Sequence, residues 1–223
     1  MRQLILDTET TGLDYQKDRI IELACLEVVN NAYTERKFHQ YYNPGGVVIS
    51  EQSEEIHGLS NSFLRKFNSF DESLADFIDF VGDDELVIHN AQFDISMINN
   101  ALKRKNRPEI EMDRVLCTLE MAKKKFPGSK NNLNALCRRF NISLESREKH
   151  GALTDCFLLL RVFMELLGGK QEKLTFSAKP SSSEFSEDIN YQSRKGTLIS
   201  VSQEEILEHK STLSKIDNPI WNQ

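Results

Sequence analysis

The 223-residue sequence has few cysteines and a single tryptophan. The four cysteines, Cys25, Cys117, Cys137 and Cys156, form no CxxC pair and have no metal-ligand spacing. This pattern argues against a disulfide framework and against a zinc site built from thiolates. Because each cysteine lies among apolar neighbours, we expect reduced core residues in a cytoplasmic protein.

Long hydrophobic runs and an excess of basic residues are also lacking. The most apolar segment, residues 157–167, is interrupted by Arg161 and Glu165, and no apolar stretch of signal-peptide length precedes Asp7. We therefore expect no membrane span. The formal net charge of −6 is unlike that of a nucleic-acid binder that works through bulk positive charge. Nucleic acid is not excluded, because bound metal ions can supply positive charge at a phosphate.

Apolar patterning predicts strands early in the chain and helices later. Three strand-like runs, separated by turn residues, cover residues 3–7, 19–29 and 37–42. A further short apolar strand is expected at 86–89. Helical spacing is found at residues 61–81, 94–102, 119–125, 133–140 and 152–167. This order predicts an α/β fold in which a mixed sheet, beginning with an antiparallel meander, is covered by helices on both faces.

Composition divides the chain into three expected regions. Residues 1–170 carry the periodic patterns of a folded domain. Residues 171–200 are rich in Ser, Lys and Glu and poor in apolar periodicity, which is typical of a disordered linker. In residues 201–223, Ser202 and Glu205 form a capping-box pattern ahead of a short amphipathic helix. A helix this short cannot bury its apolar face alone, so we expect it to dock on a partner.

Two carboxylates interrupt what otherwise reads as a buried strand. Asp7 and Glu9 follow the apolar residues 4–6 without a turn residue between them. Side chains at i and i+2 of a strand point to the same face, so these two acids are expected side by side. Like charges at that spacing repel unless a proton or a cation is shared between them.

Two later motifs add further acids and a histidine. HNAQFD places Asp94 just after an apolar strand, at the start of a helix, where α/β sheets present site residues. HGALTD places His150 in the loop before the last core helix and Asp155 one turn inside it.

Four carboxylates without a matching buried Lys or Arg in their motifs favour Mg²⁺ or Mn²⁺ over zinc. Two such ions about 4 Å apart stabilise both the attacking and the leaving oxygen of a phosphodiester displacement. A neutral histidine, whose ordinary pKa is about 6.5, can take the proton of the attacking water.

DTETTG, HNAQFD and HGALTD, in this order and at these separations, resemble the three motifs of the DEDD 3′–5′ exonucleases, in the subgroup with His five residues before the last Asp. Over residues 1 to 170 the chain resembles the proofreading subunits of bacterial replicative DNA polymerases. The resemblance implies a ribonuclease-H-like fold, with a mixed five-stranded sheet flanked by helices, and two Mg²⁺ or Mn²⁺ ions per site. It makes His150 the general base. The metal ligands that it implies are Asp7, Glu9, Asp94 and Asp155.

The stretch EIHGL also fits this family. It implies that His57 lies in a loop contacting the 3′-terminal nucleotide, with Ile56 as an apolar wedge beside the base. Thr10 would offer its backbone or hydroxyl to the same nucleotide. The family often has an acid five positions before this histidine; Gln52 stands there, which leaves a contact at that position open. The implied substrate-binding set is Asp7, Glu9, Thr10, Gln52, Ile56, His57 and Asp155.

The region after residue 170 resembles partner-binding segments of the same polymerase subunits. QEKLTF is similar to the Gln-x-x-Leu-x-Phe peptide that binds the sliding clamp, through Gln171, Leu174 and Phe176. The last segment resembles the tail that binds the polymerase alpha subunit, and a small third core subunit is a further candidate partner. The contact residues implied in the tail are Ile206, Leu213 and Trp221.

Three other interpretations are weaker. DTETT is similar to the nucleophile loop of haloacid-dehalogenase phosphatases, but that class needs a second Asp where Glu9 stands and gives HGALTD no role. A stand-alone exonuclease trimming RNA or DNA ends would not need an anchoring tail. A catalytically silent tether between clamp and polymerase would be expected to have lost a ligand. We therefore predict a proofreading exonuclease that removes mismatched 3′-terminal deoxynucleotides from a frayed or single-stranded DNA end.

Overall fold

The structure, a computed structural model, describes residues 1–145, 147, 149–168 and 201–215. The chain divides into two units, residues 1–175 and 176–223, which are treated separately below. Within the described ranges, no helix has both the length and the apolar character needed to cross a membrane. The expected boundaries at residues 170 and 200 fall outside the described residues, so the three-region division stays a prediction.

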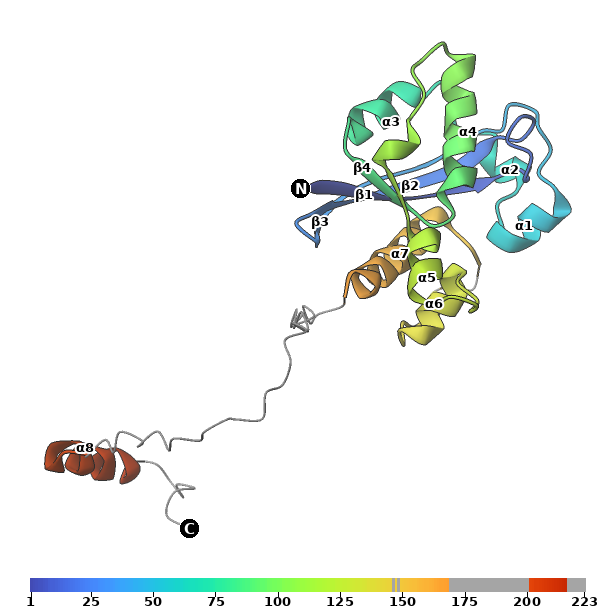
Figure 1. Ribbon diagram of the computed structural model, residues 1–223. Coiled ribbons are helices and arrows are strands. Elements are labelled where there is room, and N and C mark those ends of the chain that lie inside the picture. Colours follow the sequence, from blue (N-terminus) through green and yellow to red (C-terminus); the bar gives the residue numbers. More distant parts are fainter. Residues whose placement is uncertain (146, 148, 169–200, 216–223) are drawn as a thin grey trace, which may run out of the picture. The chain divides into compact units, whose positions relative to one another are not determined.

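A five-stranded mixed sheet forms the centre of the first unit (Figure 1). Its strands are β1 (Arg2–Thr10), β2 (Ile20–Val29), β3 (Ala32–Tyr41), β4 (Glu85–Ile88) and β5 (Val115–Cys117). They lie in the order β3-β2-β1-β4-β5. The first three pair antiparallel, whereas β4 is parallel to β1 and β5 is parallel to β4. The carboxyl ends of β1 and β4 therefore lie at the same edge of the sheet.

Helices cover both faces of this sheet, as the sequence predicts. In Figure 1, α3 and α4 lie on one side and α5, α6 and α7 lie on the other. A single 3₁₀ turn, Met112–Arg114, precedes β5. The second unit contains α8 (Gln203–Leu213). The helices of the first unit are α1 (Glu51–His57), α2 (Asn61–Leu64), α3 (Leu74–Val81), α4 (Ala91–Arg104), α5 (Thr118–Lys125), α6 (Leu133–Arg139) and α7 (Ala152–Leu167).

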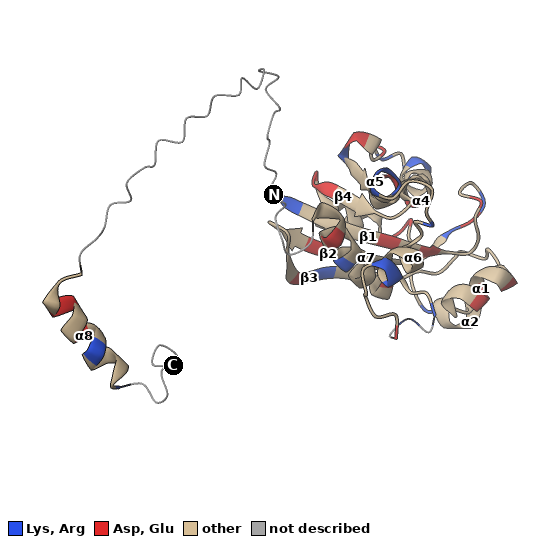
Figure 2. Ribbon diagram, turned by 60° about the horizontal axis from the view of Figure 1, so that its bottom comes forward, with Lys and Arg blue, Asp and Glu red and all other residues tan. Residues whose placement is uncertain are grey.

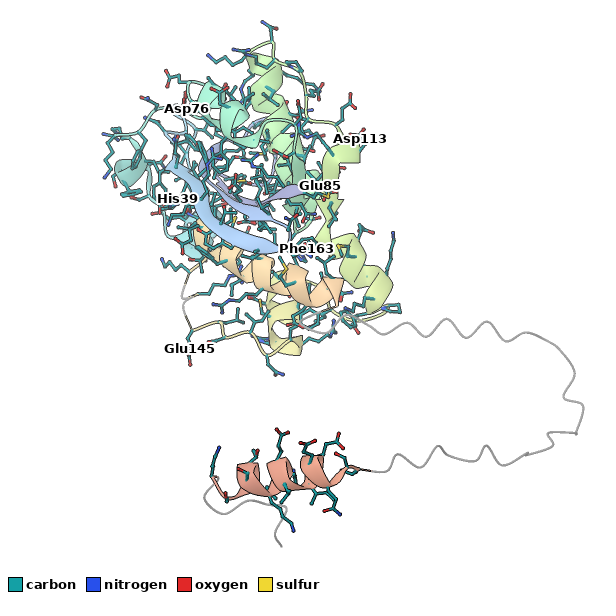
Figure 3. The ribbon with its side chains drawn as sticks, turned by 90° about the vertical axis from the view of Figure 1, so that its left-hand side faces the viewer. His39, Asp76, Glu85, Asp113, Glu145 and Phe163 are labelled. Atoms are coloured by element: carbon teal, nitrogen blue, oxygen red, sulfur yellow. The ribbon has the colours of Figure 1, made fainter. Side chains whose placement is uncertain are left out.

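Strand β1 is apolar on both faces because it is covered on both. Leu4 and Leu6 pack into the cluster that contains α3 and α4, whereas Ile5 packs with α6 and α7. Phe163 of α7, labelled in Figure 3, is fully buried in the same cluster as Ile5. By the same alternation, Asp7 continues on the α7 side of the strand.

The cysteines are interior residues. Cys25, Cys137 and Cys156 are buried and Cys117 is half-buried. The Cys156 thiol of α7 donates to backbone carbonyls of both β1 and β2, at 3.5 and 3.3 Å. Cys137 and Cys156 pack on the α6 and α7 side of the sheet, whereas Cys25 and Cys117 pack on the α3 and α4 side.

Two segments differ from the expected pattern. The helical spacing over residues 61–81 corresponds to two helices, α2 and α3, because Phe67 and Phe70 pack in different clusters, against Tyr41 and Tyr42 respectively. The helical spacing of Phe67 and Phe70 thus reflects two separate aromatic contacts and not one continuous helix. Strand β3 begins at residue 32 rather than 37, and its first residues pair with the end of β2.

Candidate active site

The motif residues converge on one pocket at the carboxyl edge of the sheet. The pocket has a volume of about 480 Å³ and is lined by Asp7, Glu9, His150 and Asp155. These come from the end of β1, the loop before α7 and the first turn of α7. Figure 2 shows the acidic residues of β1 in red within the fold. All three motifs therefore reach this cavity, the second of them through His89, Asn90 and Phe93.

Asp7 and Glu9 lie in an environment that disfavours their ionised forms. Burial raises the pKa of Asp7 well above its usual range, and the nearby carboxylates of Asp94, Asp155 and Glu9 raise it further. Burial also raises the pKa of Glu9, to about 8, with contributions from Asp155 and Glu22. A site that concentrates buried carboxylates in this way favours a proton or a bound cation.

Asp94 lies next to the residues that line the pocket without lining it itself. It belongs to the first turn of α4, its side chain is buried, and it is not among the residues lining the cavity. Thr8 donates a hydrogen bond from Oγ1 to Asp94 Oδ1 at 2.7 Å. Burial raises the pKa of Asp94 to about 7, and the bond from Thr8 opposes that rise. The second motif is thus joined to β1 through Thr8.

Replacing Thr8 with valine is expected to destabilise the metal-free protein by about 1–3 kcal/mol. Valine keeps the shape of threonine but removes the hydroxyl that donates to the buried Asp94 carboxylate. Urea denaturation in EDTA measures the loss. Thr34→Val is the matched control, because the exposed Thr34 hydroxyl also donates to a carboxylate, Glu27, at 2.7 Å. The control should change by no more than about 0.5 kcal/mol, and equal losses in both variants would contradict the prediction.

His150 and Asp155 lie where the sequence places them, in the loop before α7 and in its first turn. The His150 backbone N–H donates to the Ile56 carbonyl of α1 at 3.0 Å, which fixes the loop. His150 Nδ1 lies 3.6 Å from Asp155 Oδ2. Ligand atoms of Glu9, His150 and Asp155 all lie within 4.8 Å of one another. This arrangement brings a base candidate to two carboxylates that can hold a cation.

Arg147 is a member of the site that the sequence analysis did not identify. Its guanidinium donates to both oxygens of Asp155, through Nε at 2.6 Å to Oδ1 and through Nη2 to Oδ2. Both side chains are only 6% exposed. Arg147 also donates to Asn134 Oδ1, and its Nη2 lies 3.0 Å from His150 Nδ1. Asp155 therefore has a buried basic partner, which lies just before its motif rather than within it.

The site fits a divalent cation held by oxygen ligands. Among the described residues lining the pocket, Arg147 is the one Arg or Lys. The histidines add little positive charge, because burial lowers the pKa of His57 and His150, and lowers that of His89 to about 4. Carboxylates therefore outnumber positive groups, as in sites for Mg²⁺ or Mn²⁺. The residues able to hold such ions are Asp7, Glu9, Asp155 and, next to the lining residues, Asp94.

All the residues expected to contact substrate line this pocket, except Gln52. Ile56 lines the cavity and is 43% exposed, as a wedge requires. Thr10 also lines it, and its hydroxyl donates to the Gly12 carbonyl at 2.7 Å, which leaves only acceptor capacity toward a ligand. Gln52 is exposed and does not line the pocket, whereas its neighbour Ser53 does.

His57 lies at the end of a helix, which corrects the expected loop. Ser50 caps α1 by accepting from the Ser53 N–H at 3.1 Å, and Gly58, with φ of 73°, ends it. The His57 side chain is buried; its Nδ1 accepts from the Leu59 N–H at 3.0 Å. Its Nε2 has no hydrogen-bond partner among the described residues. His57 lines the pocket, and this nitrogen itself is buried.

Other lining residues were not anticipated either. Leu13, Phe93 and Asn134 reach the pocket from the turn after β1, from α4 and from α6. Leu13 is 79% exposed. A leucine directly after the glycine of DTETTG could have been noticed as an apolar residue in a polar turn. Phe93 and Asn134 carry no comparable sequence signal.

The second unit contains the expected capped helix. Ser202 and Glu205 form both hydrogen bonds of a capping box at the start of α8. Ile206 and Leu213 lie on α8 seven residues apart, on the same side of the helix. Ile206 is 38% exposed. The remaining partner-binding candidates lie outside the described residues: Gln171, Leu174, Phe176 and Trp221.

Comparison with known proteins places the chain among exonucleases, as its motifs predict. The RNase T family, described as Exonuclease, matches residues 4–163. The chain is 41% identical over 223 residues to DNA polymerase III subunit epsilon of Rickettsia felis, across 97% of each protein. Most of the chain, including residues beyond the catalytic motifs, thus has a counterpart in that relative.

Solved structures share the fold of the first unit. Exonuclease X in complex with 5′ overhanging duplex DNA is 26% identical, with a TM-score of 0.56 over 74% of this chain and 90% of that one. The nuclease domain of 3′hExo, a DEDDh family member bound to rAMP, is 17% identical, with a TM-score of 0.64 over 74% and 91%. The predicted ribonuclease-H-like mixed sheet flanked by helices is thereby confirmed.

Proposed function

Because the chain belongs to the RNase T family of exonucleases, alongside the epsilon subunits of DNA polymerase III, we propose that it removes mismatched nucleotides from DNA 3′ ends during replication. The observation that carries the proposal is the pocket in which Asp7, Glu9, Asp155 and His150 converge. This combination of carboxylates and a neutral base suits hydrolysis of a phosphodiester.

The carboxylates would hold two divalent cations, Mg²⁺ or Mn²⁺. Asp7 would be shared between the two ions, Glu9 and Asp155 would hold one of them, and Asp94 would help to hold the other. When bound, the ions supply positive charge where the attacking and leaving oxygens become negative. The raised pKa values of Asp7, Glu9 and Asp94 support this assignment, because a cation removes the repulsion that raises them.

His150 would take a proton from the attacking water. The water oxygen bonds to phosphorus, the bond from phosphorus to the 3′ oxygen breaks, and the leaving oxygen takes a proton from solvent. The product is a nucleoside 5′-monophosphate and a DNA shortened by one residue. Burial lowers the pKa of His150, which keeps the ring neutral at neutral pH, the form that can accept a proton.

Further substrate contacts would come from other residues that line the pocket. Ile56 would lie beside the terminal base, and the Nε2–H of His57, whose Nδ1 accepts from Leu59, would donate to the nucleotide. Thr10 would accept through its hydroxyl or act through its backbone. Gln52 lies outside the lining, so a contact there would require the strand to extend beyond the cavity. A mismatched end frays more readily, which would provide selectivity without reading the base.

We further propose that the segments after the exonuclease domain join it to the replication machinery. Residues 171–176 would bind the sliding clamp through Gln171, Leu174 and Phe176. The tail after residue 200 would bind the polymerase alpha subunit, with Ile206, Leu213 and Trp221 at the contact. The capped helix and the exposed Ile206 support a docking role for α8. A small third core subunit would complete the assembly.

The proposed function predicts that purified protein with Mg²⁺ shortens a 5′-labelled primer faster when its 3′ end is mismatched on the template than when it is paired. Gel analysis of the primer measures both rates, and an RNA oligomer is tested in parallel. Asp7→Ala is the control for contaminating nucleases. Preference for RNA would instead indicate an RNA-trimming enzyme, and absence of metal-dependent activity would leave only a tethering role.

A further inference from the structure

The contact between Arg147 and Asp155 places a fixed positive charge on a carboxylate assigned to metal binding. Arg147 reaches both Asp155 oxygens, and both side chains are 6% exposed. A bidentate pair of a guanidinium and a carboxylate is among the strongest polar contacts in proteins. A divalent cation that uses Asp155 must therefore compete with Arg147 for the same oxygens.

The same guanidinium also engages the general base. Nη2 of Arg147 lies 3.0 Å from His150 Nδ1. Because a guanidinium only donates hydrogen bonds, Nδ1 is the acceptor, and the proton of the neutral ring is on Nε2. The lone pair that could accept a proton from water is therefore occupied while Arg147 remains in place.

Charge balance favours departure of Arg147 when metal ions arrive. Asp7, Glu9, Asp94 and Asp155 carry four negative charges when ionised, against one positive charge on Arg147. With Arg147 in place, the four ionised carboxylates leave the site with a net charge of −3. Two divalent cations add four positive charges, so the site would then have a net charge of +1. The guanidinium would then be repelled by the ions at close range.

We propose that Arg147 is a built-in counter-ion of the metal-free pocket, which divalent cations displace from Asp155 as they bind, and that its departure releases the Nδ1 lone pair of His150 for proton transfer. The inference rests on the proposed two-cation function. It makes Arg147 a positioning residue that links metal occupancy to availability of the base, so a metal-free site is held inactive as well as neutralised.

Arg147→Gln tests the competition directly, through calorimetric titration of the full-length protein with Mn²⁺ in the absence of nucleic acid. We expect binding at least about tenfold tighter than in the wild type, a difference of about 1.4 kcal/mol, because the ion no longer displaces a cation. Melting in EDTA should occur at a lower temperature, because Asp155 has lost its partner. A purely structural role would weaken Mn²⁺ binding instead.

Arg104→Gln is the matched control. Arg104 forms a similar fork with Asp71, through Nε and Nη2 at 2.7 Å each, outside the active-site pocket. Its loss should leave Mn²⁺ affinity unchanged. Arg147→Lys, which keeps the charge without the fork, should bind Mn²⁺ with intermediate affinity.

A second measurement uses the wild-type protein and does not depend on folding of a variant. Titration with Mg²⁺ should shift the Nε–H resonance of Arg147 in ¹H–¹⁵N spectra and leave that of Arg104 in place. The Arg147 proposal is overturned if the Arg147 resonance does not move at saturating Mg²⁺. It is also overturned if Arg147→Gln binds Mn²⁺ as tightly as the wild type or more weakly. Neither result would contradict the two-cation function. A wild-type protein that binds no Mn²⁺ would overturn the two-cation function as well.

Discussion

The Asp7→Asn protein is expected to lose at least about a thousandfold in exonuclease rate while becoming more stable in the absence of metal. A bound metal ion contributes several kcal/mol of charge stabilisation in the transition state, and each 1.36 kcal/mol corresponds to a factor of about ten in rate. Asparagine is nearly the same size as aspartate, so the pocket keeps its shape. What it loses is the negative charge that the two cations would share.

The stability gain follows from the direction of the pKa shift. Burial and neighbouring acids hold the pKa of Asp7 well above its usual value, so the folded protein retains a proton that the unfolded chain releases. Stability therefore falls as the pH rises from the unfolded pKa toward the folded one. The asparagine side chain of the variant does not titrate, so the variant's advantage in melting temperature should be small near pH 4 and large near pH 8.

Both effects can be measured on one preparation. Single-turnover degradation of a labelled primer in Mg²⁺ gives the rate, and melting in EDTA from pH 4 to 8 gives the stability. Asp113→Asn, which removes an exposed acid away from the pocket, should change neither. A variant with normal activity would remove Asp7 from the metal site. A metal-free variant less stable than wild type at pH 8 would mean that Asp7 is not repelled by its neighbours.

The sequence predicted the sheet well where burial alone decided the pattern. Residues 4–6 are apolar because both faces of β1 are covered, and the continuous run indicated this directly. The pattern failed at residues 61–81, where Phe67 and Phe70 occur at helical spacing but contact separate tyrosines. Periodic spacing indicates that residues are buried, but it does not indicate in which hydrophobic cluster each residue packs.

The site was predictable to the extent that its chemistry lies within short motifs. Asp7 and His150 could be identified because local spacing placed them at the end of a strand and in front of a helix. Arg147 could not, because its importance comes from reaching Asp155 and Asn134 at once, from a loop without periodicity. His57 was expected in a loop, since a helix as short as α1 leaves few repeats to recognise.

His150→Ala is expected to slow the exonuclease by a factor of about 100 to 10,000, the range for loss of a general base. Unlike Asp7→Asn, it should leave metal binding nearly intact, because the carboxylates remain. The variant also keeps the backbone N–H that donates to the Ile56 carbonyl, so the loop before α7 should remain in position. Mn²⁺ titration and melting temperature check both points, and His209→Ala, on α8, is the control.

The pH dependence of the rate distinguishes a lost base from a distorted site. Burial lowers the pKa of His150 from its ordinary value of about 6.5, so the wild-type rate should rise with pH through the acid range and then level off. The alanine variant has no such group, and added imidazole should restore part of its rate by accepting the proton from water. If the rate of the alanine variant still rises with pH through the acid range, and imidazole restores no activity, another group takes the proton. Arg147 donates to the Nδ1 lone pair of His150 until divalent cations displace it. The rise of the wild-type rate with pH should therefore also depend on Mg²⁺ concentration, and the alanine variant should lack that dependence.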